Sequence, residues 1–126
     1  MPRQATQPAP ASEGAVVTKA TLRAAEHLGL SNKVLARIIG LSEATVSRMG
    51  SRAYTLSPDG KSFELAVLFV RLFRGLDAVA HGDADVARTW LESENAALGG
   101  RPIVLIQSVP GLLNAVSYLD ARRALV

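Results

Sequence analysis

Histidine and carboxylate side chains are the first candidates for chemistry, and this chain offers few arrangements of them. His27 and His81 are its two histidines. His81, Asp83 and Asp85 could form a metal site, but Asp83 is placed to cap a helix and Asp85 to lie in that helix's first turn. No nucleophile–histidine arrangement, phosphate loop or His/Glu helix motif accompanies them. We therefore expect a protein that is not an enzyme, with no catalytic residue, metal, cofactor or small-molecule substrate.

Lysine and arginine side chains point to a different chemistry, the binding of a polyanion. Residues 15–56 contain six basic and two acidic side chains, a net charge of +4. Residues 57–126 contain seven basic and eight acidic side chains, a net charge of −1. The positive charge is thus concentrated in the first third of the chain, where nucleic acid would dock. An ordinary solvated basic surface is the alternative. Cysteine is absent, which excludes disulfides and thiolate metal sites.

Helices must position these side chains, because apolar residues recur every three or four positions and no segment alternates with period two for long. The expected fold class is all-α. Gly29 and Gly40 are predicted helix stops, and Ser31, Ser42 and Ser108 are predicted caps. Ser57-Pro58 is predicted to begin a long helix. The predicted helices cover residues 16–28, 32–39, 42–49, 58–80, 84–92, 103–107 and 109–125.

The long predicted helix over 58–80 is apolar around most of its circumference, so we expect it to be buried on nearly every side. The apolar surface of this helix could be buried within one chain or against a second copy of the chain. The second possibility predicts a homodimer. The candidate dimerisation residues are Phe63, Val67, Val70 and Phe73. The chain contains no apolar run long enough to span a membrane and no secretory signal at its start, so a cytoplasmic protein is expected.

The segment LARIIGLSEATVSRM, residues 35–49, has the spacing of a helix-turn-helix. Ala36 is the small residue where the two helices approach, and Gly40 is the turn residue that tolerates positive φ. Apolar residues face the junction at Leu35, Ile39, Leu41, Val46 and Met49. The set resembles the DNA-binding helix-turn-helix of phage-repressor (Xre-like) regulators.

In that motif the second helix enters the major groove, with its N-terminal residues nearest the bases. Its outward positions here are Ser42, Glu43, Ala44, Ser47 and Arg48. Arg48 is suited to guanine and Glu43 to the cytosine amino group. Lys33, Arg37 and Arg52 are better suited to phosphates, which position the protein without reading sequence. A well-packed three-helix core that does not bind DNA is the alternative.

A second pattern, WLESENAALGGRPIVLIQSVPGLLNAVSYLDARRA, covers residues 90–124. It resembles the toxin-binding domain shared by the Xre/MbcA/ParS antitoxins. The matching residues are Trp90, Leu91, Asn95, Ala97, Leu98, Gly99, Gly100, Arg101, Pro102, Leu105, Ile106, Gly111, Val116 and Leu119. Val104 departs from the family's pattern, which commonly has an acidic residue there. With the helix-turn-helix, the resemblance covers about residues 16–126.

The resemblance implies an antitoxin of a type II toxin–antitoxin pair. Its partner would be a RES-domain toxin that consumes NAD or transfers ADP-ribose, and its own operon would be its DNA target. The implied toxin-facing residues are Gly99, Gly100, Arg101, Pro102, Tyr118, Arg122, Arg123 and Val126. Arginine at the mouth of the toxin's site would exclude an anionic dinucleotide. A homodimeric transcriptional regulator without a toxin partner is the alternative.

These predictions divide the chain into three parts. Residues 1–14, rich in Pro, Ala and Gln, form an expected disordered tail. Residues 15–56 form the helix-turn-helix domain, which would bind operator DNA. Residues 57–126 form the dimerisation and toxin-binding domain.

Overall fold

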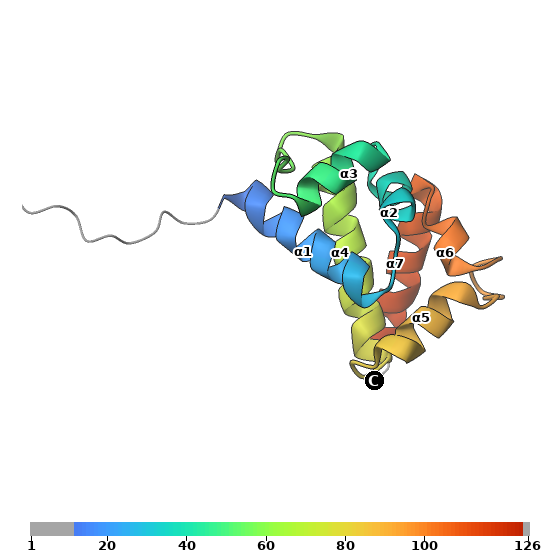
Figure 1. The fold of residues 1–126 in the computed structure, drawn as a ribbon. Coiled ribbons are helices and arrows are strands. Elements are labelled where there is room, and N and C mark those ends of the chain that lie inside the picture. The colour runs from blue at the N-terminus through green and yellow to red at the C-terminus, as the bar shows by residue number, and fades with distance from the viewer. Residues whose placement is uncertain (1–11, 125–126) are drawn as a thin grey trace, which may run out of the picture.

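The computed structural model describes residues 12–124, and the all-α prediction is confirmed there (Figure 1). Residues 1–11 of the predicted tail and Val126 lie outside this range. One isolated bridge, between Asn95 and Gly100, is the single β-type pairing in the described residues. The helices are α1 (Glu13–His27), α2 (Asn32–Ile39), α3 (Glu43–Gly50), α4 (Lys61–Val79), α5 (Ala84–Glu92), α6 (Pro102–Leu105) and α7 (Val109–Ala124).

Serine side chains begin the first three helices, as capping chemistry requires. The Ser31 hydroxyl accepts from the Val34 N–H at 3.2 Å, and the Ser42 hydroxyl accepts from the Thr45 N–H at 3.1 Å. Ser12 does the same for Ala15 at 3.0 Å, so α1 begins at Glu13, earlier than the predicted residue 16. The predicted stop at Gly40 is confirmed by its left-handed backbone, with φ of 73°.

The prediction that Ser57-Pro58 begins the long helix is wrong. Helix α4 begins at Lys61 with Gly60 as its N-cap, and the Gly60 N–H donates to the Ser57 carbonyl at 2.9 Å. Pro58-Asp59-Gly60 is a sequence that favours a turn as strongly as a helix start, and the turn prevails here. The Leu56 N–H donates to the hydroxyl of buried Thr18 at 3.0 Å, which ties this connection to α1.

Helix α4 is the centre of the core. It packs along α7 on one side and along α1 on another, and it also contacts α2 (Figure 1). Phe69, Leu72 and Leu76 are fully buried on these sides. At Gly75 an added Cβ would lie 3.1 Å from the Leu119 Cβ, so glycine allows α4 and α7 to approach closely.

The expectation that α4 is buried around most of its circumference is confirmed, and one exposed stripe runs along it. Glu64, Val67, Arg71 and Arg74 are exposed, and Val67 is 43% exposed. Helices α1 and α7 cover two sides of α4 and leave a strip between them open. None of the described helices is both long enough and apolar enough to cross a membrane.

Candidate functional site

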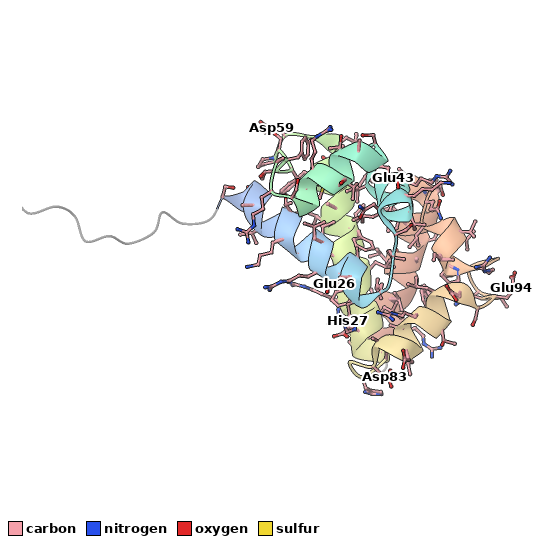
Figure 2. All side chains as sticks on the ribbon, in the orientation of Figure 1. Glu26, His27, Glu43, Asp59, Asp83 and Glu94 are labelled. Atoms are coloured by element: carbon pink, nitrogen blue, oxygen red, sulfur yellow. The ribbon has the colours of Figure 1, made fainter. Side chains whose placement is uncertain are left out.

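The predicted helix-turn-helix is present as α2 and α3. Leu35, Ala36 and Ile39 of α2 are buried with Val46 and Met49 of α3, so the apolar junction forms as its spacing predicted. Glu43, at the start of α3, is exposed on the outward side of this helix (Figure 2). A short helix with one buried and one exposed side is the arrangement that a DNA major groove admits.

The residues predicted to contact DNA are all exposed: Lys33, Arg37, Ser42, Glu43, Ala44, Ser47, Arg48 and Arg52. A chain of hydrogen bonds organises two of them. The Arg48 guanidinium donates to the Thr45 hydroxyl at 2.9 Å, and the hydroxyls of Thr45 and Ser42 lie 2.8 Å apart. The Ser42 hydroxyl is therefore already engaged as a cap, and Thr45, which the sequence did not single out, orients Arg48.

The basic residues of the first third lie on several helices, and Lys19, Arg23 and Arg52 line one pocket beside the end of α3. Lys33 and Arg37 lie on the exposed side of α2, whereas Lys19 and Arg23 of α1 line a groove against α4. Helical spacing alone assigns a residue to a side of its own helix, and only the packing of the helices decides which sides are neighbours.

A tight turn follows α5 and contains the first group of predicted toxin-facing residues. The Asn95 N–H donates to the Gly100 carbonyl at 2.9 Å, and the Asn95 side-chain oxygen accepts from the Leu98 N–H at 3.1 Å. Gly99 has φ of 85°, a left-handed backbone that other residues rarely adopt. Arg101 is exposed, and its Nε donates to the Glu92 carbonyl at 3.0 Å. The hydrogen bond from Nε to the last residue of α5 therefore restrains the Arg101 side chain.

The second group of predicted toxin-facing residues lies at the other end of α5. Arg122 and Arg123 line a cavity of about 390 Å³ together with His81, which precedes this helix. Figure 2 shows Asp83 and Glu94 at the two ends of α5. The helix has nine residues, which rise about 13 Å. The predicted residues are thus two separate groups rather than one site.

Two aromatic rings stack between α5 and α7 beside the second group. The rings of Trp90 and Tyr118 have centroids 6.3 Å apart, and the Arg122 guanidinium carbon lies 5.8 Å from the Tyr118 centroid. Both rings are half-buried. Trp90 is therefore a packing partner at the edge of the core, and Tyr118 contacts it rather than projecting freely.

Three exposed apolar side chains on α6 and α7 were missed by sequence reasoning. Val104 is 56% exposed, Val109 is 49% exposed and Leu113 is 45% exposed. Val109 and Leu113 are one helical turn apart on α7, and Val109 is seven residues before buried Val116. Helical spacing places Val109 near the side of Val116, so the sequence alone gives no signal of its exposure. Exposed apolar side chains gathered on consecutive elements indicate a binding surface.

Of the predicted dimerisation residues, Phe63, Val70 and Phe73 are half-buried and Val67 is exposed. His27 contacts this region, with its Nε2 3.5 Å from Asp77 Oδ1 and its ring edge-on to Phe73. No group of three His, Asp or Glu side chains suited to a metal ion occurs in residues 12–124.

The fold and these surfaces define a helix-turn-helix protein with a second, binding half. The chain matches the antitoxin Xre-like helix-turn-helix domain over residues 7–71 and the antitoxin Xre/MbcA/ParS C-terminal toxin-binding domain over residues 75–124. It belongs to the Xre/MbcA/ParS antitoxin family. Families of this kind are typically non-enzymatic. No curated protein matches the chain. The central helix α4 runs through the end of the first match and the start of the second.

Proposed function

We propose that this protein neutralises a RES-domain toxin by occluding its NAD-binding active site, and that it represses its own operon as a cytoplasmic homodimer. The observation that carries the proposal is the match of the toxin-binding domain to residues 75–124. That range contains the constrained turn, the exposed apolar side chains of α6 and α7, and the arginines of α7. The helix-turn-helix over residues 15–56 would bind operator DNA, and residues 57–126 would hold the toxin and the second copy.

The proposed toxin surface combines apolar and charged anchors. Val104, Val109 and Leu113 offer apolar area whose burial would stabilise the complex. Arg101 offers a guanidinium whose Nε is occupied, so that its terminal N–H groups remain for a carboxylate of the toxin. In protein–protein interfaces a few residues supply most of the binding energy, and arginine is enriched among them.

Occlusion of the active site is assigned to the end of α7. An NAD-consuming site must accept the two phosphates of its substrate. Arg122 and Arg123, placed at the mouth of that site, would donate to acceptor oxygens of the toxin there and so block entry of the dinucleotide. Arg122 lies over the Tyr118 ring, and the aliphatic part of Arg123 lies near Gly75. Both side chains are therefore partly ordered before the toxin binds.

The decisive experiment measures NAD consumption by the cognate toxin in the presence of the full-length protein. The wild-type chain should abolish consumption, and Arg122→Ala/Arg123→Ala should leave the toxin active while still co-purifying with it. Lys33→Ala/Arg37→Ala is the matched control, because it removes two exposed cations from α2 and should neutralise normally.

Two outcomes would reject the proposal. Full inhibition by Arg122→Ala/Arg123→Ala would exclude the occlusion mechanism. Purification of the protein from its native cells without any stoichiometric partner, bound to DNA with a steep dependence on salt, would favour a regulator that has no toxin.

A further inference from the structure

A groove of about 630 Å³ lies between α1 and α4, and none of its lining residues belongs to α3 or to the proposed toxin surface. Its apolar lining comprises Ala15, Val16, Ala20, Ala24, Val70 and Phe73. Val16 is 54% exposed, and Val67, one helical turn before Val70, is 43% exposed. Exposed valines beside a groove of this size indicate that something covers it.

The edges of the groove are positively charged. Lys19 and Arg23 of α1 and Arg74 of α4 line it, all three are exposed, and no acidic side chain lines it. Within residues 12–124 none of the three forms an ion pair. Two such grooves placed face to face would bring like charges together, which is costly. The occupant must therefore be apolar with acidic side chains beside it.

The outer side of α5 has that chemistry. Asp85, Thr89 and Glu92 form one exposed stripe at helical spacing, and Val86 beside it is 50% exposed. Residues 83–94 contain four acidic side chains and one basic, a net charge of −3. The basic residue is Arg88, which donates to the Glu26 and His27 carbonyls of α1.

The acidic side of α5 cannot reach the groove of its own chain. Ala87 and Leu91, on the opposite side of α5, are buried in the core. Asp85 and Glu92 therefore face away from the core of their own chain. A second copy of the chain is the molecule that presents the same acidic helix to the groove.

We propose that two copies of this chain associate by placing α5 of each copy in the α1–α4 groove of the other. Val86 would lie against Val70 and Phe73, and the two carboxylates of the stripe would lie beside the cations of the groove. Because each copy gives one helix and receives one, the contact closes on itself around a two-fold axis. The inference rests on the homodimer of the proposed function and specifies its interface.

The proposed interface uses only part of the dimerisation surface that the sequence indicated. Val70 and Phe73 line the groove, whereas Phe63 and Val67 would lie outside its lining. Val104, Val109 and Leu113 on α6 and α7 take no part, so the dimer keeps these anchors available for the toxin. Charge complementarity is what distinguishes this interface from direct packing of α4 against α4.

A charge-exchange experiment on the full-length protein tests the proposal. One variant carries Arg23→Glu/Arg74→Glu in the groove, and the other carries Asp85→Lys/Glu92→Lys on α5. Each alone should weaken self-association about tenfold or more, because like charges then meet in both contacts. Mixing the two should restore a dimer, since both contacts again pair opposite charges. Sedimentation equilibrium and native mass spectrometry would measure this, with circular dichroism verifying the fold.

The control is Lys33→Glu/Arg37→Glu, which reverses two exposed cations on α2 and should leave the dimer intact. The proposal is overturned if the groove variant still dimerises, if the mixed variants stay monomeric, or if the wild-type chain is a monomer. Loss of the dimer in Val67→Asp but not in the charge variants would show direct α4 packing instead. A monomeric wild type that still inhibits the toxin would overturn this inference alone and leave the proposed function standing.

Discussion

Arg88 of α5 holds the C-terminal end of α1 through the carbonyl of His27. Its Nε donates to that oxygen at 3.1 Å, and its Nη2 donates to the Glu26 carbonyl at 3.4 Å. Carbonyls in the last turn of a helix lack intrahelical partners, and a cation suits the negative end of the helix dipole. An added Cβ at Gly29 would lie 3.0 Å from Arg88 Nε. Glycine at this position, just after α1, therefore leaves room for the Arg88 guanidinium. One side chain thus joins the helix-turn-helix region to the toxin-binding region.

Substitution of Arg88 should weaken this connection. We expect Arg88→Ala to lower the free energy of unfolding by about 1 kcal/mol. This is less than a buried charge-assisted bond contributes, because Arg88 is exposed. Arg88→Lys should retain the favourable charge but lose the paired geometry, and fall between the two. Urea denaturation followed by circular dichroism would measure this. Equal stability of Arg88→Ala and the wild type would show that the contact contributes nothing.

Two glycines should respond to alanine in opposite directions. At Gly111 an added Cβ would lie 1.8 Å from the Leu105 carbonyl oxygen, a backbone atom that cannot move without displacing α6. At Gly50, the last residue of α3, nothing lies within 4 Å. We expect Gly111→Ala to cost roughly 2 kcal/mol or more and Gly50→Ala to stabilise by about 0.5 kcal/mol. Thermal unfolding of the two variants in parallel would decide, and destabilisation by Gly50→Ala would contradict the second part.

Thr45 should affect DNA binding through Arg48. Thr45→Val removes the hydroxyl that accepts from the Arg48 guanidinium while keeping the side-chain shape. If Arg48 reads a base, Arg48→Ala should cost about 1–3 kcal/mol at one operator position, and Thr45→Val should weaken the same position less. Lys33→Ala should instead weaken binding to every sequence and lower the salt slope by about one unit. Fluorescence anisotropy on substituted operators at several salt concentrations separates these effects, and a Thr45→Val protein with unchanged sequence preference would refute the orienting role.

The exposed apolar side chains of α6 and α7 should control toxin affinity. Leu113→Asp should weaken toxin binding by about tenfold or more, because a carboxylate would be buried without a partner. Unfolding should be little changed, since Leu113 is outside the core. Thr55→Asp places the same charge on an exposed position of the α3–α4 connection and should bind as the wild type does. Isothermal titration with purified toxin would test this, and equal affinity of the two variants would remove Leu113 from the interface.

The sequence alone determined the local structure, because helix starts, stops and apolar sides depend on neighbouring residues. Ser31, Ser42 and Gly40 act as their types predict, and the junction of Ala36 with Val46 follows from spacing. The family resemblance was also carried by residues that lie close in sequence. Ser57-Pro58 failed because a turn and a helix start share the same local signals there.

Only the tertiary structure decided which surfaces became neighbours. It placed Arg101 and Arg122 at opposite ends of α5, brought Lys19 and Arg23 to a groove with Arg74, and left Val104 and Leu113 exposed. Each of these outcomes depends on how helices distant in sequence pack on α4. Spacing along a helix fixes the side of the helix on which a residue lies. Which other helix that side contacts depends on how all the helices pack together to bury their apolar surface.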